Sequence, residues 1–386
     1  MSSMLYETLR RRVEDGTVPG AVALVARGDD AEVVAVGSAD ADGRVPLTRE
    51  SLFRIASITK PIMAAGLLTL VEEGRVALDA PIAEWLPELA KPRVVRTPSS
   101  PVDDTVPAAR PVTVEDLLAS RPGWGLPSDF SLPAAKALWQ VQDHSRPFWS
   151  WPDPDEWLAR LAEVPMLHRP GEAWLYGTAS ALQGLLAARV SGLTLPEFLA
   201  ERIFEPLGMK DTAFEVPPAK RDRFTWAYAP SESGAPRLTD TPDGDFAGVP
   251  RFASGGGGLV STADDWLAFA RMLLSGGGDV LSPTSVSRMT SNHLTAGQRE
   301  NATLFLKGQG WGYGGQVDVD PIDPWNVPGC YGWVGGTGTT AHVIPATNTV
   351  TILMTQVAMT GPTPNPLMRE FWRVCVQAGP GKQFVA

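Results

Sequence analysis

Ser57 and Lys60 are the two residues of this sequence whose types and spacing could together perform chemistry. They lie three positions apart in "IASITKP", residues 55–61. A serine hydroxyl is a weak nucleophile until a base takes its proton. A lysine can act as that base once burial or a nearby charge lowers its pKa. The chain has seven lysines and no other S-x-x-K. On spacing alone, a helix cap followed by a surface lysine stays an open alternative.

Pro61 indicates where the next helix begins. Proline is tolerated in the first turn of a helix but not in its interior. The stretch "PIMAAGLLTLVEEG" therefore predicts an apolar helix that begins near Ser57 and ends at Gly74. Residues three apart share a helix face, so Lys60 would reach the serine hydroxyl. Unpaired N–H groups and the positive dipole end would surround Ser57, which favours an anionic reaction centre there.

The bulk composition excludes several classes of partner. The 386 residues are 44% hydrophobic, with a net charge of −10 and a pI near 5.0. Such a chain is not expected to bind nucleic acid or an anionic membrane. The N-terminus has no apolar run of signal-peptide length, and "GLLTLVEEG" is too short to cross a bilayer. We therefore expect a cytoplasmic protein. Cys330 and Cys375 form no zinc pattern.

The positioning elements are β-rich at both ends of the chain and helical in the middle. "AVALVARG" and "EVVAVGSA" predict a hairpin, and three stretches after residue 308 predict further antiparallel strands. We therefore predict an α+β fold in which residues 1–85 and 255–386 form a domain with an antiparallel sheet flanked by helices. Residues 86–254 would be an inserted, mainly helical region with long loops. Its expected helices lie near 113–119, 154–163, 179–190 and 195–204.

Four segments together resemble the serine β-lactamase and penicillin-binding-protein superfamily. "ASITKPIMAAGLLTLVEEGRVALDAPIAEWLPE" is similar to the helix that carries the nucleophile. "PGEAWLYGTASALQGLLAARVSG" resembles the segment with the Tyr-x-Asn motif, and "ASGGGGLVSTADDWLAFARMLLSGG" a glycine-rich stretch and helix. "GWVGGTGTTAHVIPATNTVTILMTQ" resembles the strand that carries Lys-Thr-Gly. The resemblance covers about residues 20 to 360 and is strongest to the class C-like branch, which includes the family VIII carboxylesterases. It implies a β-lactamase/transpeptidase-like fold.

This resemblance assigns roles to individual residues. It implies that Ser57 is the acylated nucleophile, that Lys60 is its proton partner and that Tyr176 is the base or proton shuttle. A phenol near an ammonium is easier to deprotonate, which agrees with that role. The backbone N–H groups of Ser57 and Gly336 would form the oxyanion hole. Thr178 stands where many relatives have asparagine, a departure that could weaken a contact to a substrate amide.

The expected substrate pocket combines Trp333, Gly335 and Thr178 with Trp124. In "WVGGTG", Trp333 occupies the position of the β-lactamase lysine. An indole offers an apolar wall where the lysine would bind an anionic carboxylate. The prediction is therefore a carboxylesterase that acts on small neutral esters. Amide or β-lactam hydrolysis, D-peptidase activity and acyl transfer remain alternatives, because all begin with acylation of Ser57. A catalytically silent binding protein on the same fold would not need Ser57, Lys60 and Tyr176 together.

Other enzyme classes receive little support from the sequence. An α/β-hydrolase would need a G-x-S-x-G elbow, which is missing. A Ser–His–Asp enzyme would need one of His144, His168, His293 and His342, and none has a suggestive context. His342, in "TTAHVIP", is interpreted as structural. The histidines form no metal-ligand pattern, so we expect no metal and no cofactor. The expected partner is a small-molecule ester or amide substrate, and the oligomeric state stays open.

Overall fold

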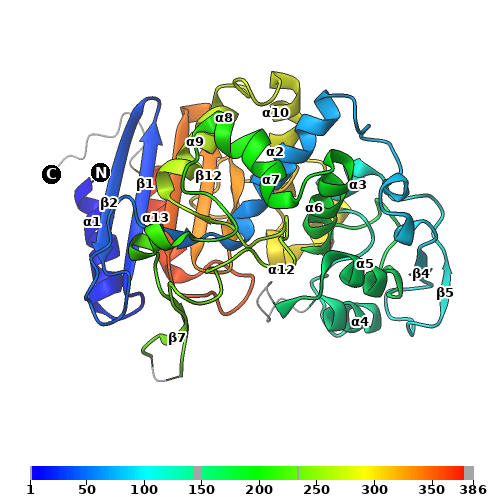
Figure 1. Cartoon of the computed structure of the whole chain (residues 1–386), viewed down its shortest axis with the longest axis horizontal. Coiled ribbons are helices and arrows are strands. Elements are labelled where there is room, and N and C mark those ends of the chain that lie inside the picture. Colours follow the sequence, from blue (N-terminus) through cyan, green and yellow to red (C-terminus); the bar gives the residue numbers. More distant parts are fainter. Residues whose placement is uncertain (1, 143–149, 233, 378–386) are drawn as a thin grey trace.

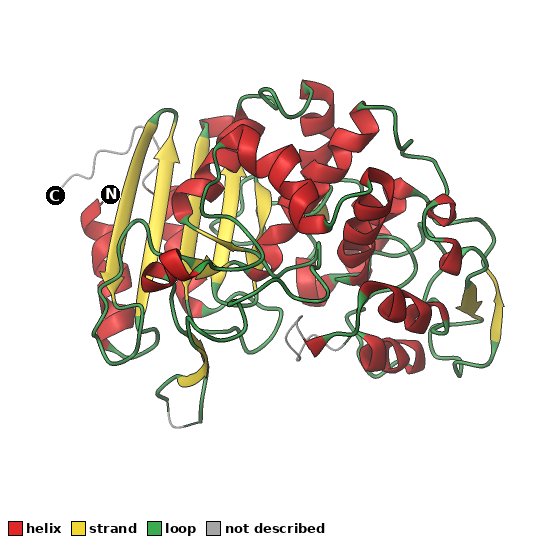
Figure 2. Ribbon diagram, viewed as in Figure 1, coloured by secondary structure: helices red, strands yellow, loops and turns green. Residues whose placement is uncertain are grey.

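A seven-stranded antiparallel sheet is the frame of this protein, whose computed structural model describes residues 2–142, 150–232 and 234–377. The strand order is β2-β1-β13-β12-β11-β10-β9, and Figure 2 shows the sheet in yellow. Both ends of the chain contribute to it, as the predicted fold requires. The strands are β1 (Gly20–Arg27), β2 (Asp30–Gly37), β9 (Gly310–Trp311), β10 (Gln316–Val317), β11 (Tyr331–Gly335), β12 (Thr339–Ile344) and β13 (Thr349–Thr355).

Helices cover both faces of the sheet because the central strands are apolar on both sides. All seven residues of β13 and the first seven of β1 are buried. Alternate side chains of β1 point to opposite faces. Ala21 and Ala23 pack with helices α1 (Ser2–Glu14) and α13 (Pro366–Gln377). Val22 and Leu24 belong to the larger core that contains α2 (Thr59–Glu72) and α9 (Ala263–Leu274). The sheet therefore separates an outer helical layer from the main core.

The middle of the chain forms a helical region beside the sheet, on the right in Figure 1. Each of the four helices predicted there is present. The last of them continues as a π-helical turn over Ala200–Phe204. The helices are α3 (Val114–Leu118), α4 (Pro133–Val141), α5 (Pro154–Ala162), α6 (Thr178–Ser191), α7 (Leu195–Leu199) and α8 (Glu205–Leu207); the strand pairs are β4 (Arg93–Val95) with β5 (Thr105–Pro107), and β6 (Ala227–Ala229) with β7 (Arg237–Asp240). The sequence interpretation missed two helices, α4 and the three-residue α8, and the two short strand pairs.

The remaining elements complete the main core. They are β3 (Phe53–Arg54) paired with β8 (Val260–Ser261), followed along the chain by α10 (Pro283–Thr290), α11 (Ala296–Asn301) and α12 (Thr303–Leu306). Among the residues that the structure describes, no helix combines the length and apolar character needed to span a membrane. The division into two regions at residues 85 and 255 stays a prediction.

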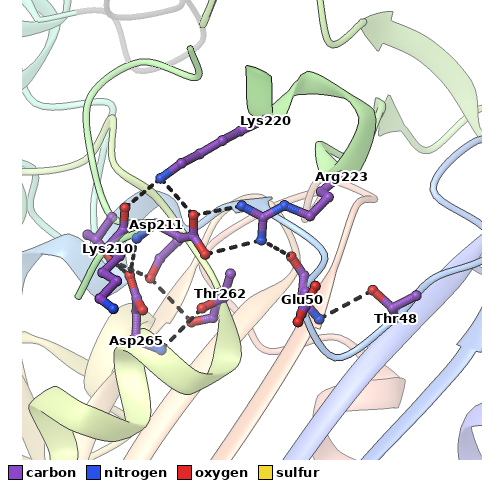
Figure 3. A network of polar contacts seen from close by, with 10 residues as sticks. Thr48, Glu50, Lys210, Asp211, Lys220, Arg223, Thr262 and Asp265 are labelled. Carbon is purple, nitrogen blue, oxygen red and sulfur yellow. Dashed lines mark hydrogen bonds and ion pairs between the residues drawn. The ribbon is translucent and has the colours of Figure 1, made fainter. Parts of the chain in front are cut away.

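A network of polar contacts joins the end of the helical region to the start of α9 (Figure 3). Asp265 lies in the first turn of α9, where Thr262 caps the helix by accepting from the Asp265 N–H. The Asp265 carboxylate accepts hydrogen bonds from the backbone N–H of Asp211 at 2.7 Å and from the hydroxyl of Thr212 at 2.8 Å. Only 8% of Asp265 is exposed. Because both donors depend on one carboxylate, Asp265 links two distant segments.

We predict that Asp265→Ala destabilises the fold far more than Asp264→Ala. The first change leaves the Asp211 N–H without its acceptor and removes the carboxylate from the Thr212 hydroxyl, which is then left with Ser261 Oγ. The loss costs about 2–3 kcal/mol. Asp264 is the neighbour in the same helix turn, but its ion pair with Arg49 is exposed, so its loss costs about 1 kcal/mol at most. Urea unfolding of both variants measures the difference. Equal midpoints would show that the network contributes no special stability.

Candidate active site

Ser57 lies in a one-turn 3-10 helix, Ala56–Ile58, between strand β3 and helix α2. Ala56 has a φ of +43°, a conformation that costs a residue with a side chain about 1–2 kcal/mol. Two threonines from the turn between β11 and β12 hold this segment. The Thr337 hydroxyl donates to the Arg54 carbonyl at 2.5 Å, and the Thr339 hydroxyl donates to the Ile55 carbonyl at 3.0 Å. The strained turn is therefore fixed by neighbours on a different part of the sheet.

Lys60 begins helix α2 and is almost completely buried, with 2% of its surface exposed. Its ammonium donates to Ser57 Oγ at 2.9 Å and to the carbonyl oxygen of Gly256 at 2.6 Å. Burial lowers the pKa of Lys60, and the nearby Tyr176 phenol offsets only part of that shift. A lysine with a lowered pKa can exchange a proton with a neighbouring hydroxyl under mild conditions.

Tyr176 reaches the same serine from the helical region. Hydrogen bonds in both directions with the backbone of Leu126 fix its main chain, and Gly177, with a φ of +94°, turns the chain into α6. The Tyr176 hydroxyl donates to Ser57 Oγ at 2.8 Å. Lys60 Nζ lies 4.7 Å from the centre of the tyrosine ring. Burial by itself would raise the pKa of Tyr176, but the charge of Lys60 and hydrogen bonds with Ser57 and Trp333 outweigh it and lower the pKa.

Trp333 connects the tyrosine to the sheet. It lies on β11, and its indole N–H donates to the Tyr176 oxygen at 3.1 Å. Phe305 of α12 stacks on the Tyr176 ring with 4.8 Å between centroids. Trp174 and Trp311 complete an aromatic group around these two rings. A donor on the phenol oxygen and packed rings around it favour one orientation of Tyr176.

The glycines after Trp333 let this end of β11 approach the serine segment. A side chain at Gly335 would place its first carbon 2.5 Å from the Ile55 carbonyl oxygen and 2.2 Å from the Thr339 hydroxyl. Only glycine avoids both collisions. Gly336 follows directly at the end of the strand and is exposed. The structure thus brings the predicted oxyanion glycine next to the segment that leads to Ser57.

Two residues expected in the substrate pocket are buried instead. Thr178 has no exposed surface, and its hydroxyl donates to the side-chain oxygen of Gln142 at 2.6 Å. Trp124 is 2% exposed, and its indole N–H donates to the Val164 carbonyl. Both side chains face the protein interior and offer no surface to a substrate. The assignment of both residues to the substrate pocket stays a prediction, as does that of Trp333, of which 4% is exposed.

The histidines are not gathered at this site in the described residues. His342 pairs with Gly332 across β12 and β11, so its side chain lies on the sheet face opposite to Trp333. There it meets the ring of Trp372 from α13. His144 lies outside the described residues. Within residues 2–142, 150–232 and 234–377, no three side chains of His, Cys, Asp or Glu form a group that could hold a metal.

Two contributors to the site were not predicted. The Gly256 carbonyl accepts a hydrogen bond from Lys60, which lies 196 positions earlier in the sequence. Only the glycine-rich stretch around Gly256 drew attention to this segment in the sequence. Phe305 had no signal at all. A cleft with about 550 Å³ of empty space, partly open to solvent, is lined by Phe305, Trp333 and Val334 together with Trp325 and Trp372. Ser57 and Tyr176 are not among its lining residues, so the cleft adjoins the aromatic group rather than the nucleophile.

Comparison with known proteins shows which family and which enzymes this chain is similar to. The model of the family described as beta-lactamase matches residues 5–367. Esterase EstB of Burkholderia gladioli is 32% identical over 338 residues, which cover 81% of this chain and 78% of the esterase. Lovastatin esterase of Penicillium rubens is 31% identical over 317 residues, covering 75% and 76%. The solved structure of EstCE1, a hydrolase with promiscuous acyltransferase activity, superposes with a TM-score of 0.79 at 22% identity, covering 97% of both chains.

Trp333→Phe should move the pH dependence of catalysis while keeping an aromatic ring in place. The change removes the N–H that donates to Tyr176, so a phenolate there is less stabilised and the pKa of Tyr176 rises. One hydrogen bond of about 1 kcal/mol corresponds to roughly 0.7 pH unit. The rising limb of kcat/KM for a p-nitrophenyl ester should therefore move to higher pH by about that amount. A limb that stays in place would exclude Trp333 from tuning the tyrosine.

Proposed function

The chain belongs to the beta-lactamase family, and on that basis we propose that it is a serine carboxylesterase that forms an acyl-enzyme at Ser57. One observation carries the proposal: Ser57 Oγ accepts hydrogen bonds from both the Lys60 ammonium and the Tyr176 hydroxyl, at 2.9 and 2.8 Å. Two donors on one oxygen stabilise the negative charge that develops when the serine loses its proton. The similarity to two esterases supports the same reaction class.

In the acylation step, the Tyr176–Lys60 pair has first lost one proton, which leaves a Tyr176 phenolate beside the Lys60 ammonium. The phenolate then takes the Ser57 proton while Oγ attacks the ester carbonyl carbon. The carbonyl electron pair moves onto oxygen and gives a tetrahedral oxyanion. We assign its two donors to the backbone N–H groups of Ser57 and Gly336, each worth about 3 kcal/mol in sites of this kind. The buried Lys60 charge stabilises the deprotonated tyrosine during the transfer.

The intermediate then collapses in the opposite direction. The bond between the carbonyl carbon and the alcohol oxygen breaks, and the same Tyr176–Lys60 pair protonates the departing alcohol. Water next attacks the acyl-enzyme, loses its proton to the pair and releases the acid and free Ser57. One pair of groups therefore serves as base and as acid in each half-reaction, and the two groups titrate together rather than independently.

Trp333 favours neutral esters over anionic substrates. Its indole N–H is already engaged with Tyr176, and the rest of the side chain is apolar. It supplies no cation for the carboxylate of a β-lactam or of a peptide terminus. Amide or β-lactam hydrolysis, D-peptidase activity and acyl transfer share the acylation of Ser57, and we rank them below ester hydrolysis for this reason. The cytoplasmic location stays a prediction, and the oligomeric state stays open.

The proposal is tested by assaying wild type and Ser57→Ala side by side. The substrates are short-chain p-nitrophenyl esters and a chromogenic cephalosporin. We expect the wild type to hydrolyse the esters and to leave the cephalosporin largely intact. Ser57→Ala should lower ester turnover by a factor on the order of 10⁵, because the remaining groups act only through the nucleophile. Preferred turnover of the cephalosporin, or ester turnover that survives in the variant, would overturn the proposal.

A further inference from the structure

Arg54 is a buried charged residue that lies three positions before the candidate nucleophile. Its residue surface is 7% exposed, and it ends β3, the strand that leads into the strained turn at Ala56. Its guanidinium donates to the Thr225 carbonyl at 2.6 Å and through two nitrogens to one oxygen of Asp240. A charge in this position is costly to bury, so its retention needs an explanation beyond packing.

The Arg54 side chain joins the nucleophile segment to a distant loop. Asp240 ends strand β7, and its second carboxylate oxygen accepts from the N–H groups of Thr241 and Asp245. The rings of Phe224 and Phe246 lie 4.1 and 5.2 Å from the guanidinium carbon, so the cation is enclosed by aromatic faces. Phe224, Asp240 and Phe246 thereby surround the side chain of Arg54.

The Arg54 main chain joins the same segment to the oxyanion side of the site. Its carbonyl oxygen accepts from the Thr337 hydroxyl at 2.5 Å, one residue after Gly336. The next carbonyl, that of Ile55, accepts from Thr339. Arg54 therefore contacts Thr225 and Asp240 through its side chain and the β11–β12 turn through its backbone. Both N–H groups assigned to the oxyanion hole lie close to these contacts in the sequence. Ser57 comes three residues after Arg54, and Gly336 comes directly before Thr337.

We infer that Arg54 is a positioning residue that sets the spacing between Ser57 and Gly336. This inference rests on the proposed function. A guanidinium held at Thr225 and Asp240 fixes where β3 ends, and the Thr337 bond transfers that position to the glycine turn. Displacements of about 1 Å at such a site can cost 100-fold in rate. A buried ion pair can often be replaced by apolar residues without loss of stability, so we assign the Arg54–Asp240 pair a role in geometry rather than in stability.

The test separates positioning from stability with three variants. Arg54→Lys keeps the charge but loses the planar fork that reaches two acceptors. The double variant Arg54→Met/Asp240→Asn removes both charges and keeps a side-chain oxygen that accepts from the N–H groups of Thr241 and Asp245. Arg110→Lys is the matched control, because Arg110 forms a two-contact ion pair with the buried Asp116. For each protein we would measure Tm, kcat and KM for a p-nitrophenyl ester, and the rate at which a fluorophosphonate labels Ser57.

We expect Arg54→Lys and the double variant to lower kcat and the labelling rate by about 10- to 100-fold, with KM within about threefold of wild type. The double variant should keep a Tm near that of wild type, so its slow labelling cannot arise from unfolding. Arg110→Lys should label Ser57 at the wild-type rate. Because the double variant removes both charges of the Arg54–Asp240 pair, it remains informative if Arg54→Lys fails to fold.

Two outcomes would overturn the inference in different ways. If the wild type reacts with both reagents and the double variant reacts equally fast, Arg54 has a structural role alone and the proposed function stands. If the wild type neither hydrolyses esters nor takes the fluorophosphonate, the proposed function fails and the positioning role fails with it.

Discussion

The burial of the Lys60 ammonium is the constraint on which the rest of the site depends. Helix α2 is buried from Thr59 to Leu70, so the charge at its first turn is almost completely shielded from bulk water. A buried cation costs several kcal/mol unless nearby groups compensate it. Ser57 Oγ, the Gly256 carbonyl and the face of Tyr176 provide that compensation here. The same three contacts fix the positions of Ser57 and Tyr176, the groups that a substrate carbonyl would meet.

This requirement explains why the site draws on segments far apart in the sequence. The glycine-rich stretch at 254–258 brings a carbonyl to the amine, and a side chain at Gly255 would collide with Met63 and with the Ser180 carbonyl. Tyr176 is carried in by the helical region, and Trp333 by the central sheet. The Tyr176 side chain is therefore where the helical region and the central sheet contact each other in the site. Its proton responds to a cation on one side and to an indole donor on the other.

Sequence alone predicts the local parts of this arrangement well. Ser57, Lys60 and Pro61 lie within five residues, and helix geometry places the first two together without any tertiary information. The hairpin β1–β2 and the buried strand β13 were also predictable, since their strands are rich in apolar and β-branched residues and a short polar turn separates β1 from β2. Tyr176 lies 119 positions from Ser57, and only resemblance to a family pointed to it.

Sequence alone did not predict the direction of some side chains or the structure of short segments. Resemblance aligned Thr178 with a substrate-binding asparagine, but a motif position does not say where a smaller side chain turns, and its hydroxyl bonds inward to Gln142. Residues 309–319 were predicted to be β-structure, but the glycines between them divide the stretch into two strands of two residues each, β9 and β10, which the pattern did not indicate. The contact of Phe305 with Tyr176 depends on how α12 packs, which no local signal records.

Trapping the acyl-enzyme tests the central claim most directly. The protein would be mixed with p-nitrophenyl acetate, quenched in acid within the first turnover, digested and analysed by mass spectrometry. We predict a burst of p-nitrophenol and a single added acetyl group on the peptide that contains Ser57, both absent from Ser57→Ala. Ester hydrolysis with the acetyl group on another residue, or with the same burst in Ser57→Ala, would contradict a nucleophilic Ser57 activated by Lys60 and Tyr176.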